Sequence, residues 1–401
     1  MFDLLLDELI QVNTSRIVMF ILDGLGGIPE YSGGKTELET AFTPNLDDLA
    51  FRSSLGMTQP LGPGITVGSG PGHLAMFGYD PLVYEIGRGA LEVLGVDFEL
   101  GPDDIAGRGN FCTLDEHGII TDRRAGRLPT EEAVKLIEIL RTIKIDGAEF
   151  FIEPIKEHRF AFVLRKPGAK AELNGTDPLK TGVAPYPVIA LTPEAQADAD
   201  LINAFVAQAR DLLMDKSPAN MIMLRGFEKL PEIPSFSEKY KLKAAAIAVN
   251  GMYRGVARLA GMQVLNVNGI TIADEFDTLE QAWSAYDFFY FHVKKTDTYG
   301  EMGDFKGKVS VIEEFDSLLP RMLALHPDVI IIGGDHSSPS VMQSHSWHPV
   351  PLLVHSRFVR SSGIKEFGET ACAHGTLGII PAIHVMPLAL ANAGRLEKYR
   401  A

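Results

Sequence analysis

The chain has 401 residues, of which 46% are hydrophobic and 22% charged, and its formal net charge is −15. This length allows a large core and more than one domain, and the composition is that of an ordinary globular protein. The negative charge argues against nucleic acid or an anionic membrane as the main partner, and no apolar run approaches the length needed to cross a bilayer.

The N-terminal segment, residues 1–12, is amphipathic and acidic. It lacks the basic start and the longer apolar block of a secretory signal, so we predict a docked helix. Two cysteines, Cys112 and Cys372, lie far apart in the sequence and form no metal-ligand pair. This cysteine usage favours a reducing cytoplasm. The oligomeric state, a homo-oligomer included, stays open.

Short β-branched or aromatic runs alternate with helical patterns, which indicates an α/β protein with a mostly parallel sheet flanked by helices. The first clear strand is 17–22, which ends at Asp23-Gly24. Later buried strands are predicted at 244–249, 263–267, 288–293, 328–332 and 350–354. The stretch 306–325 has apolar residues at spacings of three and four, which predicts an amphipathic helix.

The middle of the chain has a different pattern. A strand is followed by a helix over 131–142, strands near Phe150 and Phe160, and a helix over 193–214. We therefore predict a second domain, residues 101–234, inserted into a first domain formed by 1–100 and 235–401. Arginines gather in this insertion at 121–127.

A glycine-rich stretch, residues 64–73, surrounds Ser69 and precedes an apolar run, 74–77, that could start a helix. A serine in such a stretch can sit on a tight turn, near backbone N–H groups and the positive end of a helix dipole, which suits a nucleophile that must meet a phosphate. Taken alone, the stretch is more typical of a surface loop with an incidental serine.

Metal-ligand residue types follow three predicted strands. Asp23 follows the first strand, Asp297 and Glu301 follow 288–293, and Asp335-His336 follow 328–332, with His345 a few residues later. Ligands of open parallel sheets bind outside the carboxyl ends of the strands, so these loops can converge. Each motif alone could be a turn or a helix cap. Together with Ser69 they predict a metal site.

Two divalent cations at such a site could bind the Ser69 oxygen and the phosphoryl oxygens during an in-line displacement. Mixed oxygen and imidazole ligands suit Mn²⁺ or Zn²⁺, and Mg²⁺ is a further candidate.

The sequence resembles the archaeal-type 2,3-bisphosphoglycerate-independent phosphoglycerate mutases, which belong to the alkaline phosphatase superfamily. The resemblance covers nearly the whole chain and rests on motifs at 23–24, 68–74, 77–81, 87–92, 121–127, 295–297, 334–337 and 344–346. It implies an alkaline-phosphatase-like α/β domain with an inserted substrate-binding domain. The implied activity interconverts 3-phosphoglycerate and 2-phosphoglycerate through a phosphoserine, without 2,3-bisphosphoglycerate.

By motif position the resemblance implies that Ser69 is the nucleophile. It implies two divalent ions, Mn²⁺ before Zn²⁺ or Mg²⁺, one held by Asp23, Ser69, Asp335 and His336 and the other by Asp297, Glu301 and His345. The inserted domain would provide arginines for the substrate carboxylate and phosphate. The candidates are Arg123, Arg124, Arg127, Arg159 and Arg225.

The chain departs from the family pattern at two positions. Glu301 stands where the family has a histidine, and His374 stands where an arginine is expected. Two alternatives therefore stay open: a metal-dependent phosphatase or phosphomutase for another small phosphorylated substrate, and a non-catalytic relative.

Overall fold

The computed structural model describes residues 2–96 and 98–400 and separates into two compact units. Unit 1 comprises Met1–Glu85 and Ile233–Ala401, and unit 2 comprises Ile86–Glu232. The first change of unit comes before helix α5 (Arg88–Gly95), because this helix packs on the sheet of unit 2. A Cβ on Gly89 of α5 would lie 2.2 Å from the carbonyl oxygen of Gly226. The boundary expected at 100/101 therefore falls inside unit 2.

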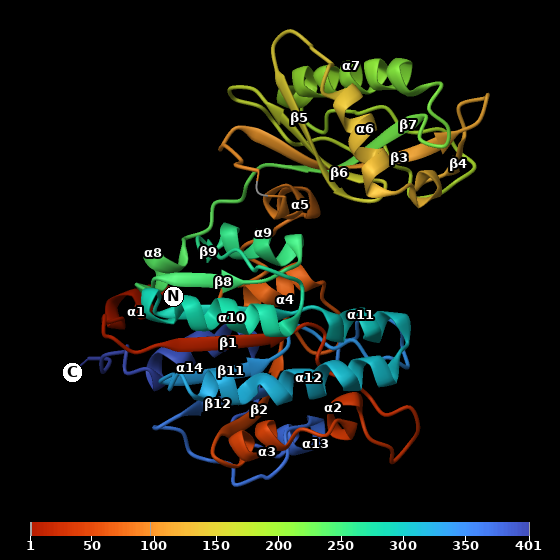
Figure 1. Cartoon of the computed structure of the whole chain (residues 1–401). Coiled ribbons are helices and arrows are strands. Elements are labelled where there is room, and N and C mark those ends of the chain that lie inside the picture. The colour runs from red at the N-terminus through yellow and green to blue at the C-terminus, as the bar shows by residue number, and fades with distance from the viewer. Residues whose placement is uncertain (1, 97, 401) are drawn as a thin grey trace. The chain divides into compact units, whose positions relative to one another are not determined.

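Unit 1 is built on an eight-stranded sheet, mostly parallel, as the sequence pattern predicted (Figure 1). The spatial order is β13-β2-β12-β11-β1-β10-β8-β9. The strands are β1 (Ile17–Leu22), β2 (Ser54–Gln59), β8 (Ala244–Ile247), β9 (Gln263–Val264), β10 (Phe288–Val293), β11 (Val329–Gly333), β12 (Val350–Ser356) and β13 (Gly378–Pro381). Only β12 among them runs antiparallel to its two neighbours, β11 and β2.

The register of the three central strands positions the candidate site. β1 pairs in parallel with β10 on one side and with β11 on the other, with Leu22 opposite Val293 and Ile21 opposite Gly333. The three strands therefore end at the same edge of the sheet, and the residues that follow them lie close together.

Helices cover both faces of this sheet, which explains why its central strands are continuous apolar runs. On one face the Phe20 ring packs against Phe276 and Phe315 of two of the helices, and on the other the Tyr290 ring packs against Phe77. The helices of unit 1 are α1 (Phe2–Leu9), α2 (Glu37–Thr40), α3 (Pro44–Phe51), α4 (Ser69–Met76), α8 (Phe236–Tyr240), α9 (Gly251–Leu259), α10 (Ile272–Ala282), α11 (Lys295–Met302), α12 (Phe305–Leu323), α13 (Glu369–Ala373) and α14 (Val385–Asn392). None of the helices in the described residues is long and apolar enough to span a membrane.

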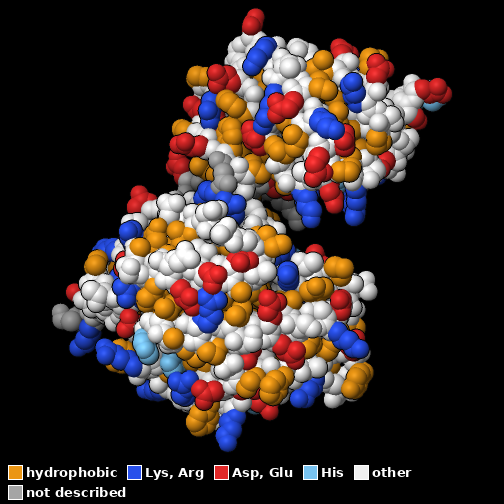
Figure 2. Space-filling model, in the orientation of Figure 1, with side chains coloured by type: hydrophobic (Ala, Val, Ile, Leu, Met, Phe, Trp, Pro, Cys, Tyr) orange, Lys and Arg blue, Asp and Glu red, His pale blue; other side chains and the backbone are white. Residues whose placement is uncertain are grey.

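Unit 2 has an antiparallel sheet in which β3 is central, flanked by β7 on one side and β6 on the other. Its strands are β3 (Asp104–Leu114), β4 (Ile120–Asp122), β5 (Glu149–Lys156), β6 (Arg159–Arg165) and β7 (Met221–Glu228). Helices α6 (Thr130–Leu140) and α7 (Gln196–Leu213) pack on one face, where Phe160, Phe162 and Phe205 form part of the core. Acidic and basic side chains are interspersed over both units on the face that Figure 2 shows.

Candidate active site and metal centre

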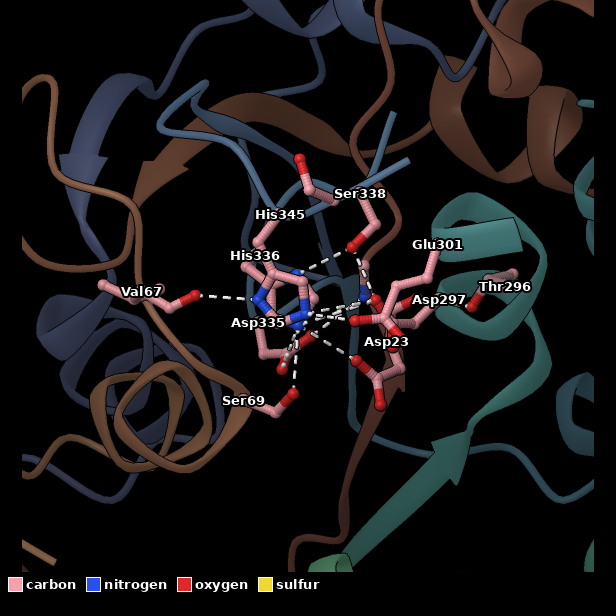
Figure 3. A network of polar contacts seen from close by, with 12 residues as sticks. Asp23, Val67, Ser69, Thr296, Asp297, Glu301, Asp335, His336, Ser338 and His345 are labelled. Atoms are coloured by element: carbon pink, nitrogen blue, oxygen red, sulfur yellow. Dashed lines mark hydrogen bonds and ion pairs between the residues drawn. The ribbon is translucent and has the colours of Figure 1, made fainter. Parts of the chain in front are cut away.

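The loops after β1, β10 and β11 bring together the acidic and histidine side chains that the sequence singled out (Figure 3). Asp23, Asp335 and His336 are completely buried, and Asp297 is 1% exposed. The Asp23 N–H donates to the carbonyl oxygen of Val293 at 3.0 Å, which ties the end of β1 to the end of β10. The predicted convergence of the strand ends is therefore present.

Asp23, Asp335 and His336 form one compact group of ligand atoms, all within 4.8 Å of one another. His336 Nε2 lies 3.2 Å from Asp23 Oδ1 and 3.3 Å from Asp335 Oδ2. The hydroxyl of Ser69 lies 3.1 Å from the same nitrogen. These are the four residues expected to hold one metal ion.

The chemistry of this group fits a divalent cation. Asp23 Oδ1 and Asp335 Oδ2 are buried oxygens that accept no hydrogen bond from the described part of the chain. Burial acts to lower the pKa of His336, but the charges of Asp335, Asp23 and Asp297 raise this pKa to about 9. Buried carboxylate oxygens that accept no hydrogen bond favour a positive charge nearby, and two carboxylates with an imidazole are a common ligand set for transition metals.

A second group consists of Asp297, His336 and His345, again with ligand atoms within 4.8 Å of one another. The His336 and His345 rings stack with centroids 3.7 Å apart. His345 Nδ1 lies 2.9 Å from the carbonyl oxygen of Val67, so this nitrogen carries the proton and Nε2 keeps its lone pair.

Glu301 lies at the border of this second group. Its carboxylate oxygen is 3.5 Å from His345 Nε2, the same distance that separates this nitrogen from Asp297 Oδ1. The Glu301 side chain is 54% exposed, whereas Asp297 is buried. Asp297, Glu301 and His345, which were expected to share an ion, therefore lie together. The compact group of ligand atoms, however, contains His336 in place of Glu301.

Ser69 is the first residue of helix α4, which begins five residues earlier than the apolar run that was expected to start it. The serine is buried, and its hydroxyl reaches the group of Asp23, Asp335 and His336 because the helix lies against the Asp335 loop. A Cβ on Gly72 of this helix would lie only 2.4 Å from the carbonyl oxygen of Asp335. The glycine therefore allows the close approach that brings Ser69 to His336.

Lys294 is a site residue that the sequence reasoning missed. Its ammonium lies 3.0 Å from Asp23 Oδ2, 2.5 Å from Asp297 Oδ2 and 2.9 Å from the Tyr253 hydroxyl. Burial opposes the charge of Lys294, but Asp23 and Asp297 raise its pKa overall. In the sequence, the position of Lys294 directly before the motif 295–297 could have indicated that it belongs to the site.

Two buried histidines behind the first ligand group were also missed. His292 Nε2 lies 3.2 Å from Asp23 Oδ2, and burial lowers the pKa of His292 to about 4. His73 Nδ1 lies 2.8 Å from the carbonyl oxygen of Ser69 and 3.0 Å from Asp335 Oδ2. The signals were a polar residue inside the apolar strand β10 and a histidine three residues after Gly70 in helix α4.

The candidate substrate arginines lie in unit 2, and two of them share a face of its sheet. Arg225 on β7 and Ala161 on β6 both pair with Arg108 on β3, and Arg159 pairs with Asn110. Since paired residues of antiparallel strands share a face, Arg108, Arg159 and Arg225 lie on the face opposite helices α6 and α7. Arg108 was missed, although it is the one cation in an otherwise mostly apolar strand.

The other three arginines lie near the turn after β4. Arg123 makes a two-pronged ion pair with Asp177, at 3.0 and 2.7 Å, whereas Arg124 and Arg127 are exposed. Burial and the nearby charges of Arg159, Arg124 and Arg108 lower the pKa of His158 to about 4. Unit 2 thus carries a local concentration of positive charge within a strongly acidic chain.

Comparison with known proteins connects these features to one family. Residues 50–220 match the model of the 2,3-bisphosphoglycerate-independent phosphoglycerate mutases. A Thermosipho melanesiensis protein named "Probable 2,3-bisphosphoglycerate-independent phosphoglycerate mutase" is 52% identical, with 99% of this chain and 98% of the relative covered. An Aquifex aeolicus protein of the same name is 48% identical, with 99% of each chain covered.

Two solved structures resemble the whole chain. A protein from Pyrococcus horikoshii is 30% identical with a TM-score of 0.84, covering 97% of this chain and 100% of its own. The cofactor-independent phosphoglycerate mutase of Thermoplasma acidophilum is also 30% identical, with a TM-score of 0.76 and coverage of 95% and 100%.

Proposed function

The chain belongs to the 2,3-bisphosphoglycerate-independent phosphoglycerate mutases, and we propose that it interconverts 3-phosphoglycerate and 2-phosphoglycerate through a phosphoserine on Ser69. The observation that carries this proposal is the buried Ser69 hydroxyl, 3.1 Å from His336 Nε2, in a site where two carboxylate oxygens accept no hydrogen bond from the described residues. No 2,3-bisphosphoglycerate is required, because the serine itself holds the phosphoryl group between the two transfers.

We propose that Asp23, Asp335 and His336, together with Ser69, hold one divalent cation. Asp297, His345 and Glu301 would hold the second. Bound there, the two cations would favour the deprotonated serine and neutralise charge on the phosphoryl oxygens. The mixed carboxylate and imidazole ligands favour Mn²⁺, with Zn²⁺ and Mg²⁺ as the alternatives.

In the first transfer Ser69 Oγ forms a bond to the phosphorus of 3-phosphoglycerate, and the bond from phosphorus to the substrate 3-oxygen breaks. The serine proton is balanced by the proton that the 3-oxygen gains, so glycerate and phosphoserine are formed. Ser69 opens helix α4, whose first backbone N–H groups have no partner within the helix and attract an anion. In the second transfer the 2-hydroxyl of glycerate takes the phosphoryl group from Ser69.

We further propose that arginines of unit 2 bind the carboxylate and phosphate of the substrate. Guanidinium groups bind both anions in a two-pronged manner, and the net charge of −15 makes such a local cationic cluster necessary. The candidates are Arg108, Arg124, Arg127, Arg159 and Arg225, while Arg123 is oriented by Asp177. A cytoplasmic location is part of the proposal, since Cys112 and Cys372 are buried free thiols.

The decisive experiment is intact-mass analysis of the chain after acid quench in the presence of 3-phosphoglycerate and Mn²⁺. We expect the wild type to gain one phosphoryl group and Ser69→Ala to remain unmodified and inactive. Ser344→Ala, at an exposed serine beside His345, is the control and should keep both phosphorylation and turnover. Undiminished turnover of Ser69→Ala in an enolase-coupled assay would refute the proposal, and free phosphate as the main product would indicate a phosphatase instead.

A further inference from the structure

Lys308 of helix α12 is completely buried, and its ammonium group is bound by backbone carbonyl oxygens. It donates to Gly24 O at 2.9 Å, to Gly26 O at 3.1 Å and to Ser338 O at 2.9 Å. An ammonium group has three N–H donors, so these three bonds use all of them.

The three carbonyl groups belong to the two loops that carry Asp23, Asp335 and His336. The loops contact each other directly, since the Ser338 N–H lies 3.2 Å from Gly24 O and 3.0 Å from Gly26 O. They pack so closely that a Cβ on Gly26 would lie 1.9 Å from Ser337 Oγ. Lys308 therefore binds the loops at the point where they meet.

The residues held by Lys308 contact the candidate ligands themselves. The Gly24 N–H donates to Asp335 Oδ1 at 3.1 Å, so the backbone after Asp23 orients Asp335. The Ser338 hydroxyl donates to Asp297 Oδ1 at 2.5 Å and lies 3.2 Å from His336 Nδ1. A shift of Gly24 or Ser338 would therefore move ligands of both groups.

A buried lysine in this position is costly, because no carboxylate among the residues that the structure describes is within hydrogen-bonding distance of its ammonium group. The nearest acidic oxygen of these residues, Glu37 Oε1, is 4.0 Å away and accepts the Ser340 N–H at 2.7 Å. The carbonyl groups and the surrounding negative charge must offset the cost of burying the ammonium.

We propose that Lys308 is a positioning residue of the metal centre, a built-in monovalent cation that joins the Asp23 loop to the Asp335–His336 loop and fixes the spacing of their ligands. The role rests on the proposed function only in the assignment of those ligands. Lys308 touches neither metal nor substrate. It acts through Gly24 and Ser338, and it should affect metal affinity before any chemistry takes place.

The test is Mn²⁺ binding to the full chain without substrate, followed by the electron paramagnetic resonance signal of free Mn²⁺. Lys308→Met keeps the apolar stem and removes the charge, and we expect its Mn²⁺ affinity to fall about 10–100-fold, the range seen for outer partners of metal ligands. Lys306→Met, at an exposed lysine of the same helix, should bind as the wild type does. Circular dichroism establishes that each variant is folded.

A second variant keeps the test decisive if Lys308→Met does not fold. Lys308→Ala, prepared and titrated with and without ammonium chloride, leaves a site in which NH₄⁺ can replace the lysine ammonium. We expect ammonium to strengthen Mn²⁺ binding by this variant and not by the wild type. Wild-type affinity in folded Lys308→Met, or affinity of Lys308→Ala that ammonium does not change, would overturn the proposal.

This readout separates the role of Lys308 from the proposed reaction. If Ser69 carries no phosphoryl group but the Lys308 variants lose Mn²⁺ affinity, the mutase chemistry fails and the positioning role stands. A wild-type chain that binds no Mn²⁺ would overturn the metal centre, and with it the role of Lys308.

Discussion

Gly72→Ala tests whether the close approach of helix α4 to the Asp335 loop controls the position of the nucleophile. The added methyl group would lie 2.4 Å from Asp335 O, 3.0 Å from Asp335 C and 3.2 Å from Asp335 Cβ. The two nearest atoms belong to the backbone of Asp335, a buried candidate ligand, so no flexible side chain can move aside. The helix and the loop must separate.

The size of the shift follows from these distances. Ordinary contacts begin at 3.4 Å, so the helix must move by about 1 Å relative to Asp335. Ser69 lies three residues earlier on the same helix, and its hydroxyl would leave its position 3.1 Å from His336 Nε2 by a similar amount. A displacement of this size can cost about 10²-fold in rate, and the crowding should cost about 1–3 kcal/mol of stability.

The assay is the initial rate of 2-phosphoglycerate formation, coupled to enolase at saturating Mn²⁺, with the melting temperature measured in parallel. Gly62→Ala is the control, because its methyl group would meet only Ile65 Cγ1, at 3.9 Å. We expect Gly62→Ala to retain the wild-type rate and Gly72→Ala to lose about two orders of magnitude while still folded at the assay temperature. A Gly72→Ala enzyme with a rate within a few-fold of the wild type would refute the reasoning.

Three further predictions concern metal preference, metal removal and pH. Glu301→His exchanges a carboxylate for an imidazole beside His345, so the metal preference should shift from Mn²⁺ toward Zn²⁺ in competition measurements. An unchanged preference would exclude Glu301 as a ligand. Chelation of the metal should lower the melting temperature, because the buried oxygens of Asp23 and Asp335 lose their cation. Adding Mn²⁺ at 100 times its Kd should restore about 2.7 kcal/mol of unfolding free energy. A melting temperature that the chelator does not change would count against the metal centre. His158 has its pKa lowered from 6.5 to about 4, chiefly by burial and Arg159, so the folded chain binds fewer protons than the unfolded chain between these values. This contribution to the free energy of unfolding is present above pH 6.5 and is lost as the pH falls toward 4, by at most about 3 kcal/mol. Chemical denaturation of His158→Gln should therefore give an unfolding free energy that depends less on pH than that of the wild type.

The centre of the fold was predictable because its strands are buried on both faces. β1 and β10 coincide with the apolar runs predicted at 17–22 and 288–293, and their ends fix where Asp23 and Asp297 emerge. β2 and β13 were not predicted. The first, Ser-Leu-Gly-Met-Thr-Gln, has few β-branched residues, and the second is a short edge strand with alternate residues exposed.

The start of α4 was predicted too late for a specific reason. Glycine and proline usually interrupt helices, so the sequence pattern placed the start at Leu74. Proline is tolerated in the first turn, where its missing N–H would have no partner in any case, and here Pro71 lies within the first turn that Ser69 opens.

The convergence of the candidate ligands could be predicted from the sequence, but the way the structure groups them could not. Strand ends determine that Asp297, Glu301 and His345 reach the same edge of the sheet. Which side chain completes a group depends on how the loops pack, here on the stacking of His336 upon His345. For the same reason no periodic pattern in the sequence pointed to Lys294 and His73, whose contacts with Asp23 and Asp335 form only when the loops pack at the edge of the sheet.

His336 belongs to both groups of ligand atoms, and this has a consequence for the order in which the centre fills. Its Nδ1 faces the Ser338 hydroxyl, so Nε2 alone offers a lone pair toward the carboxylates. One lone pair cannot serve two cations at once. An ion bound to Nε2 would therefore take a donor from the second group, and a second ion would then need the half-exposed carboxylate of Glu301. Loading should be sequential and anticooperative, with a tight and a weak step that calorimetric titration can resolve, and the weaker step should be the one that responds to residue 301.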